Sequence, residues 1–389
     1  MSNIVKEVRE QRHVNQEDLA KLARISRRSL VSIETKQAVP SVETALRISR
    51  ALHVDVDKLF IVEPAKDVDA SDLVFPHKLR YIDLFCGIGG FRFAANQCFS
   101  KYGIEGECVF SSDIDLPAQQ SYEANFGERP AGDITKVDVA DIADFDVLFA
   151  GFPCQAFSII GKREGFADKT RGTLFFEIAR ILKQKQPHAF VLENVKQLVS
   201  HDNGQTINTI ISTLRDELGY HVDYKVLNAL DYGLPQKRER IVIVGTKTPF
   251  VMRWPEKVTD PKTLTDILEP CVDPKYYASK TIVEKRKSMH ISNYKPAIWH
   301  ENKAGNISSY PYSCALRAGA SYNYLLVDGE RRLTPRECLR LQGFPDSFIM
   351  AVSDYQIRKQ AGNAVPVDMI RCVLDNFIPL AFGESRNNK

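Results

Sequence analysis

A buried strand that ends in a cysteine-bearing turn constrains the fold of this chain most strongly. The apolar run Val147–Ala150 predicts a strand, and Gly151 and Pro153 in the following GFPCQAFS predict a sharp turn that carries Cys154. In α/β sheets, ligands bind outside the carboxyl ends of the strands. Cys154 is therefore either a nucleophile at such an edge or, like most free cysteines, an inert core side chain.

Strands before this turn predict a doubly wound, Rossmann-like α/β sheet. YIDLF (81–85) leads directly into CGIGGFR, a glycine-rich strand-to-helix turn that is typical of sites for nucleotide-containing ligands. CVFSSDID (108–115) ends at Asp113, which is placed either to accept hydrogen bonds from ribose hydroxyls or to cap a helix. AGDIT places Asp133 after a third strand, so the strand before Cys154 is expected to be the fourth.

Strands after the turn bring further polar side chains to the same edge. HAFVLENV (188–195) is almost continuously apolar and ends at Glu193, which is either a helix cap or a working acid whose pKa burial would raise. Two strands are predicted within 224–246, with QKRER between them. This cluster is either a solvated turn or the source of one arginine that points into the site. Arg240 adjoins the second strand, so we favour it over Arg238.

The rest of this region is less regular. The basic, glycine-punctuated stretch 159–172 predicts either a lid over the site or a plain surface loop. From about residue 250 to 330, scattered prolines, aromatics and lysines predict a small lobe of short strands and loops. A helix capped at Thr334 with Pro335 at its first position follows, and QAGNAVPVDMI (360–370) predicts a turn into a last amphipathic helix.

The first 60 residues predict short helices instead of a sheet. Asn15 and Ser41 are expected to cap helices, and Arg24-Ile25-Ser26 breaks the pattern before a basic helix that opens at Arg27. The alternative is a small helical bundle whose arginines only face solvent. QEDLAKLARISRRSLVSIE resembles the Cro/cI-type helix-turn-helix family, which implies a recognition helix over about 27–34 in the DNA major groove.

Composition sets outer limits on these expectations. The 389 residues are 44% hydrophobic and 26% charged, with a net charge of +3 that permits a nucleic-acid partner without requiring one. No apolar run is long enough to cross a bilayer and the N-terminus lacks a signal-peptide core, so we expect a cytoplasmic protein. The eight cysteines are then expected to be thiols, and none has zinc-ligand spacing.

Six motifs occur in one order along the chain: DLFCGIGG, GFPCQAFS, ENV, QKRER, RLTPRECLRLQGFP and QAGNAVP. Together they resemble the DNA cytosine-5 methyltransferase family over nearly all of 80–250 and 331–375. The resemblance implies that Cys154 adds to carbon-6 of cytosine, that protonated Glu193 binds N3, and that an arginine of QKRER, Arg240 before Arg238, stabilises O2.

The same resemblance implies S-adenosylmethionine as cofactor and assigns a set of residues to its pocket. Two positions depart from the usual family pattern: Asp113 stands where many members have glutamate, and Ala315-Leu316 where a Thr-Leu pair is usual. The expected cofactor residues are Phe85, Gly87, Ile88, Gly90, Asp113, Ile114, Asp133, Ile134, Pro153, Leu174, Asn363, Ala364 and Val365.

We expect double-stranded DNA as the partner, with the target cytosine flipped out of the duplex. Expected domains are 1–65 (helix-turn-helix), 66–79 (linker), 80–250 with 331–389 (catalytic) and 251–330 (target recognition). A restriction endonuclease that makes no direct contact is the expected functional partner, and pairing through the N-terminal domain stays open. The expected DNA contacts are Gln16, Arg27, Arg28, Ser29, Ser32, Gln155, Ser158 and Arg171.

Three other functions were compared with the sequence. A tRNA methyltransferase of the DNA-methyltransferase type shares the motifs, but neither the helix-turn-helix nor the sizeable lobe is expected there. RNA methyltransferases of the other kind place their nucleophile two strands later, where this chain has Glu193-Asn194. A transcriptional regulator with an inactive enzyme fold is disfavoured by the presence of Cys154, Glu193 and Arg240 together.

Overall fold

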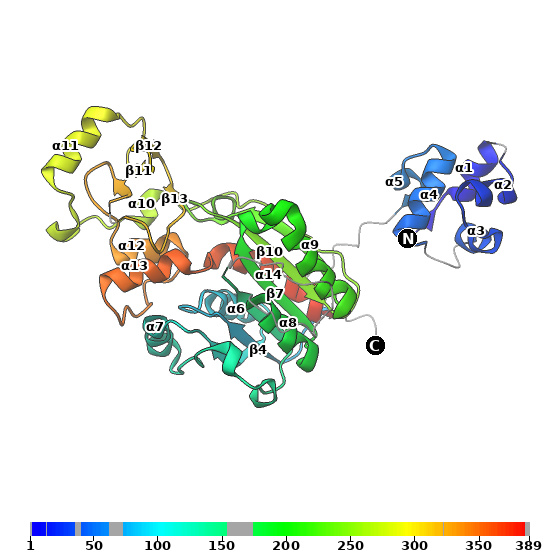
Figure 1. Ribbon diagram of the computed structural model, residues 1–389, viewed down its shortest axis with the longest axis horizontal. Helices are drawn as coiled ribbons and strands as arrows, with labels where there is room; N and C mark the ends of the chain where they lie inside the picture. Colours follow the sequence, from blue (N-terminus) through cyan, green and yellow to red (C-terminus); the bar gives the residue numbers. More distant parts are fainter. Residues whose placement is uncertain are drawn as a thin grey trace. The chain divides into compact units, whose positions relative to one another are not determined.

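The chain divides into two compact units, residues 1–73 with 385–389 and residues 74–384 (Figure 1). The computed structural model describes residues 2–12, 14–35, 40–61, 73–153, 174–321 and 323–385. Within these ranges, no helix combines the length and the apolar character needed to cross a membrane. The two units are described separately below.

The N-terminal unit is a bundle of short helices closed by a two-stranded antiparallel pair. Asn15 accepts a hydrogen bond from the Asp18 amide and Ser41 from the Thr44 amide, which confirms both expected caps. Leu19, Leu30 and Ile48 are fully buried in its core. The elements are β1 (Ser2–Asn3), α1 (Val5–Gln11), α2 (Gln16–Leu22), α3 (Arg27–Glu34), α4 (Val42–Leu52), α5 (Val56–Leu59) and β2 (Phe60–Ile61).

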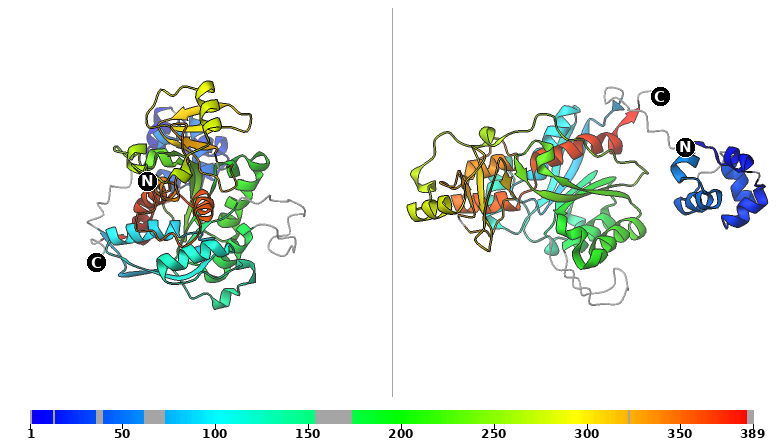
Figure 2. Two further views of the ribbon diagram at one scale, coloured as in Figure 1. Left: turned by 90° about the vertical axis from the view of Figure 1, so that its left-hand side faces the viewer. Right: turned by 90° about the horizontal axis from the view of Figure 1, so that it is seen from above.

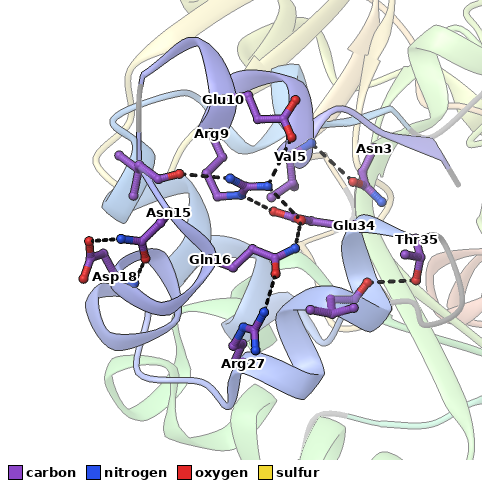
Figure 3. A network of polar contacts seen from close by, with 12 residues as sticks. Asn3, Val5, Arg9, Glu10, Asn15, Gln16, Asp18, Arg27, Glu34 and Thr35 are labelled. Carbon is purple, nitrogen blue, oxygen red and sulfur yellow. Dashed lines mark hydrogen bonds and ion pairs between the residues drawn. The ribbon is translucent and has the colours of Figure 1, made fainter.

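A buried ion pair ties the first helix of this unit to the third. Arg9 Nε lies 2.6 Å from Glu34 Oε1, and Arg9 Nη1 donates to the Val14 carbonyl (Figure 3). Gln16 Nε2 donates to Glu34 Oε2 at 2.8 Å, and its Oε1 accepts from Arg27 Nη2 at 3.3 Å. This chain of contacts holds the start of α3 against α2, as a helix-turn-helix requires.

The second unit is built on a six-stranded sheet of order β5-β4-β6-β7-β10-β8, which confirms the expected α/β class. β5, β4, β6 and β7 are parallel, whereas β10 runs antiparallel to both of its neighbours. The strands are β4 (Lys78–Leu84), β5 (Glu105–Ser112), β6 (Val147–Gly151), β7 (Ala189–Val195), β8 (His221–Asn228) and β10 (Glu239–Thr246).

Alternating strand residues supply a hydrophobic core on each face of this sheet. Tyr81, Phe149 and Val191 belong to the core that includes α6 (Gly90–Lys101) and α14 (Val367–Phe382). Leu148 and Leu192 belong to the opposite core, with α8 (Leu174–Lys185) and α9 (Gln205–Ser212). Helices therefore cover both faces, and the carboxyl ends of the parallel strands remain as the natural place for a site.

Residues 250–330 form a lobe of short elements, as expected, and Figure 2 shows it at one end of this unit. Its three-stranded antiparallel sheet has the order β12-β11-β14. The lobe also contains a helix, α11, that the sequence did not predict. The elements are α10 (Leu264–Ile267), α11 (Lys280–Met289), β11 (Ile298–Glu301), β12 (Ile307–Tyr310), β13 (Ser313–Cys314) and β14 (Leu325–Val327).

The chain returns from the lobe through two helices that pack against each other. α12 (Pro335–Leu341) begins with the expected Thr334 cap, which is part of a capping box with Glu337. α13 (Asp354–Asn363) was not predicted, and its end leads through a short turn into α14. Short strands pair elsewhere: β9 (Gln236–Lys237) with β13, and β3 (Leu73–Val74) with β15 (Glu384–Ser385).

Two expectations about the strands are wrong. AGDIT forms a single bridge, Ser112 to Ala131, because the Asp133 side chain accepts from the Thr135 amide and turns the chain into a 3₁₀ turn. The strand before Cys154 is therefore the third of the sheet along the chain. The linker also ends before 79, since β4 already begins at Lys78, whose ammonium lies 3.0 Å from Glu107 of β5. Residues 66–72 of that linker lie outside the described part of the chain.

Candidate active site

The turn after β6 is tied to the end of β7. Gly151 lies opposite Glu193 in the parallel pairing of the two strands. Asn194 Nδ2 donates to the Phe152 carbonyl at 2.8 Å, which fixes the backbone as it leaves the sheet. Cys154 follows Pro153 directly, but it lies outside the described residues, as do Gln155, Ser158 and Arg171.

Glu193 forms an ion pair with Arg240, whose Nε lies 2.8 Å from Glu193 Oε1. The contact follows from the antiparallel register, in which Glu193 faces Val242 and Arg240 faces Val195, so the two side chains are diagonal neighbours. Glu193 is 7% exposed. Burial raises its pKa, while the charges of Arg240 and Arg238 act in the opposite direction.

Arg238 lies just before β10, and its guanidinium contacts backbone carbonyls instead of Glu193. Nη1 donates to Leu316, and Nη2 donates to Gly362 and Ala364. Burial lowers the pKa of Arg238, and the nearby charge of Arg240 acts in the same direction. Arg240, and not Arg238, is therefore the arginine of QKRER that contacts Glu193, and its role as a donor to O2 stays a prediction.

The glycine-rich turn between β4 and α6 adopts a tight, open conformation. Phe85, Gly87 and Gly89 all have positive φ, of 55°, 54° and 83°. At Phe85 this conformation is strained, which is a feature of ligand sites. A Cβ at Gly90 would lie 2.6 Å from the side chain of Val365, so there is no room for a side chain at position 90. Ile88, within the turn, is buried at 1% exposure.

Asp113 folds onto this turn. Its carboxylate accepts hydrogen bonds from the Gly87 amide at 2.7 Å and the Asp115 amide at 2.8 Å. Burial raises the pKa of Asp113, and the two amides lower it. The helix α7 (Leu116–Phe126) begins after Asp115, so Asp113 is not its cap. The neighbouring Ile114 is 72% exposed, which leaves an apolar side chain free beside the carboxylate.

The other expected cofactor positions are spread over three segments. Asp133 accepts hydrogen bonds from the Thr135 amide and hydroxyl, which lower its pKa, and Ile134 is buried behind it. Pro153 is exposed, and Leu174 is half-buried at the start of α8.

The far end of the chain reaches the centre of the site. The turn of Asn363, Ala364 and Val365 joins α13 to α14. Val365 packs against Gly90 and against Gly151, where an added Cβ would lie 3.1 Å from its side chain. Asn363 is exposed beside them. The helix α14 that follows this turn packs against α6, the helix after the glycine-rich turn.

Three polar residues near the site were not singled out from the sequence. Asn194 and Gln236 act through backbone contacts that depend on distant segments. Asp83 is fully buried in β4, and burial raises its pKa to about 8. Neither of its carboxyl oxygens has a hydrogen-bond partner among the described residues. An acidic residue inside the apolar run YIDLF was the available signal.

The expected DNA contacts of the N-terminal unit gather at the start of α3. Arg27, Arg28 and Ser29 are exposed, and Ser32 is half-buried one turn later. Ser26 caps the helix by accepting from the Ser29 amide. Gln16, at the start of α2, contacts Arg27 (Figure 3).

Comparison with known sequences places the two units in two families. Residues 79–378 match the C-5 cytosine-specific DNA methylase family, and residues 5–59 match the helix-turn-helix family. The chain is 56% identical to the Type II methyltransferase M.NgoBI of Neisseria gonorrhoeae over 294 residues, 75% of this chain and 90% of that protein. It is 52% identical to M.HaeII of Haemophilus aegyptius over 302 residues, 77% of this chain and 92% of that protein.

Solved structures share the fold at lower identity. The S. pombe Dnmt2 methyltransferase matches with a TM-score of 0.59 at 21% identity, over 78% of this chain and 100% of that chain. The Entamoeba histolytica methyltransferase EhMeth matches with a TM-score of 0.59 at 17% identity, over 79% and 98%. The chain therefore belongs to the C-5 cytosine-specific DNA methylase family, and it is a DNA cytosine-5 methyltransferase of the bacterial Type II kind that carries a helix-turn-helix domain.

Proposed function

We propose that this enzyme methylates carbon-5 of a flipped-out cytosine at a specific duplex site, through Cys154, Glu193 and Arg240, and so protects DNA in a restriction–modification system. The observation that carries the proposal is the Glu193–Arg240 pair beside the backbone that leads to Cys154. A buried acid and an arginine lie together at one edge of the sheet. They can serve a cytosine ring that needs a proton donor at N3 and a hydrogen-bond donor at O2.

The residue types suit each step of the reaction. The Cys154 thiolate adds to carbon-6, forming a carbon–sulfur bond and moving electron density toward carbon-5, N3 and O2. Protonated Glu193 donates to N3 and Arg240 donates to O2. Carbon-5 then gains the methyl group and loses its proton to a base, which can be water. The carbon–sulfur bond breaks at the same stage and returns the thiolate.

The residues around the glycine-rich turn fit S-adenosylmethionine, the methyl donor that we propose for this enzyme. The start of α6 has no side-chain cap, so its first amides are available to a ligand. Asp113 is placed to accept hydrogen bonds from the ribose hydroxyls. The exposed Ile114 can pack on the face of the adenine ring, and Asp133 and Ile134 can contact the edge of that ring. When bound, the cofactor supplies a methyl group on a sulfonium. We assign the pocket to Phe85, Gly87, Ile88, Gly90, Asp113, Ile114, Asp133, Ile134, Pro153, Leu174, Asn363, Ala364 and Val365.

Methylation of plasmid DNA by the purified full chain tests this function. Labelled S-adenosylmethionine reports transfer, and bisulfite sequencing reports the base and its surrounding sequence. We expect 5-methylcytosine at one recurrent site and none with Cys154→Ser. Labelling of tRNA instead of DNA, or normal methylation by the serine variant, would contradict the proposal.

A second function is supported by the N-terminal unit, for which we propose binding of an operator and thereby regulation of transcription. The exposed Arg27, Arg28 and Ser29 open the second helix of the helix-turn-helix, the position from which such helices contact base edges. Arg28→Ala in the full chain should remove operator binding in a gel-shift assay and leave methylation of plasmid DNA unchanged. Removal of residues 1–65 should do the same. Loss of methylation would instead make this domain part of the enzyme.

A further inference from the structure

Several hydrogen bonds fix the short connection between β5 and α7. The Asp113 carboxylate accepts from the amides of Gly87 at 2.7 Å and Asp115 at 2.8 Å. The Asp113 carbonyl accepts from Gln119 Nε2 at 2.6 Å. These contacts set the direction of the Asp113 carboxylate, which the proposed function assigns to the ribose hydroxyls.

The side chain of Asp115 departs from the usual role of its position. Asp115 is the N-cap of α7, a position from which an aspartate usually accepts a hydrogen bond from a backbone amide of the first turn. Its side chain makes no such bond. One carboxylate oxygen lies instead 2.7 Å from Nζ of Lys359 in α13, 244 residues away in the sequence. Asp115 thus exchanges a local cap for an ion pair with a distant helix.

The ion pair is part of a wider contact between α13 and α7. The side chains of Lys359 and Asp115 are 35% and 24% exposed, so the pair is partly shielded from water. The next residue of α13, Gln360, accepts through Oε1 from Ser121 Oγ at 3.0 Å, and both of these side chains are buried. Two adjacent residues of α13 therefore hold α7, one at its N-cap and one at its middle.

The charge of Lys359 also acts on Asp113. Burial raises the pKa of Asp113, and the negative charge of Asp115 acts in the same direction. The positive charge of Lys359 lowers this pKa. Lys359 therefore offsets the charge of Asp115 and favours the ionised form of Asp113, whose two oxygens act only as acceptors.

We propose that Lys359 is a positioning residue for the ribose of the cofactor, because its ion pair with Asp115 holds the Asp113 carboxylate where the ribose hydroxyls bind. The proposal rests on the proposed function, which assigns Asp113 to that ribose. Lys359 acts through Asp115, whose amide donates to Asp113. Without the ion pair, the Asp115 side chain is free to turn back and cap α7, and the Asp113 carboxylate then shifts with it.

A comparison of two ligands on the full chain tests this role by binding alone. Calorimetry measures the affinity for S-adenosylhomocysteine and for an analogue that lacks both ribose hydroxyls. Removal of the hydroxyls should weaken binding to the wild type at least about tenfold, because hydrogen bonds to a carboxylate are charge-assisted. In Lys359→Met this factor should fall below about threefold, since a displaced acceptor forfeits most of a hydrogen bond. The analogue should bind both proteins equally well.

Further variants separate positioning from a folding defect. Lys359→Arg keeps a cation within reach of Asp115 and should restore most of the hydroxyl factor. Asp115→Asn removes the ion pair from the other side but leaves a residue that is favoured at an N-cap, so its loss of the factor is not a helix defect. Lys101→Met is the matched control and should leave the factor unchanged. It removes an ion pair with Asp375 at 3.1 Å, at the end of α6 away from the glycine-rich turn.

An equal loss of affinity for both ligands in Lys359→Met would show a purely structural role and overturn the proposal. A wild type that binds both ligands equally well would also overturn it, as would a hydroxyl factor that survives in both Lys359→Met and Asp115→Asn. A wild type that shows the hydroxyl factor but methylates no cytosine would instead contradict the proposed function. The two failures are thus distinguishable.

Discussion

Single buried carboxyl groups give the site its clearest dependence on pH. Glu193 is buried beside Arg240, and burial raises its pKa. A proposed donor to N3 must hold its proton, so wild-type activity should fall as the pH rises through this raised pKa.

We predict that Glu193→Gln lowers kcat/KM by about 10²–10⁴-fold, because an amide donates to N3 but cannot transfer a proton as charge develops. The fall in the remaining activity at high pH should disappear, since the amide does not ionise there. Methylation rates from pH 6 to 9 measure both effects. The control is Glu239→Gln, which alters a neighbouring, partly exposed carboxylate that pairs with Lys196. Unchanged activity in Glu193→Gln would exclude this role.

Asp83 yields a prediction for stability. Burial raises its pKa from 3.8 to about 8, so between about pH 4 and pH 8 the folded chain binds one proton more than the unfolded chain. The free energy of unfolding should therefore decrease as the pH rises through this window, by on the order of a few kcal/mol from this residue. Asp83→Asn should lose that slope and gain stability relative to the wild type at pH 8. Urea unfolding at pH 5, 6.5 and 8 tests it, and parallel slopes would contradict it.

At the scale of elements, local sequence patterns predicted helix caps and buried strands. Asn15, Ser41 and Thr334 were recognisable caps, and the apolar runs ending at Gly151 and Glu193 were recognisable buried strands. Hydrophobic periodicity and helix capping depend on residues that are close in the sequence, so both can be recognised from the sequence alone.

Contacts between distant elements were not predictable in this way. The antiparallel insertion of β10 next to β7 creates the Glu193–Arg240 pair, and sequence order alone does not fix that neighbour. Arg238 illustrates the same limit, because its partners lie 78 to 126 residues away. The sequence analysis placed Arg238 in the QKRER motif, but it did not predict that its guanidinium donates hydrogen bonds to backbone carbonyls. The role of Cys154 stays a prediction.

The contact between Gly90 of α6 and Val365 in the turn 363–365 gives a prediction for cofactor binding. Gly90→Ala places a methyl group 2.6 Å from the Val365 side chain, so one of the two segments must shift. We expect affinity for S-adenosylhomocysteine to fall at least about tenfold, with Gly319→Ala as the open-space control. Isothermal titration measures it. An unchanged affinity would mean that Val365 moves aside freely and does not shape the pocket.

At the scale of the whole molecule, the chain carries two units whose buried cores do not share residues. We predict two separable thermal transitions in calorimetry. S-adenosylhomocysteine should raise the midpoint of one and an operator duplex that of the other, because a ligand stabilises only the unit that binds it. A single transition that responds to both ligands would show that the units unfold together.

The turn at 363–365 also has a consequence for synthesis of the protein. A ribosome makes the glycine-rich turn about 270 residues before it makes this closing piece. A nascent or prematurely terminated chain therefore has the first half of its pocket but no wall opposite Gly90. Methylation should begin only after residues 363–365 have been made, and nonsense alleles upstream of Asn363 should lose methylation completely.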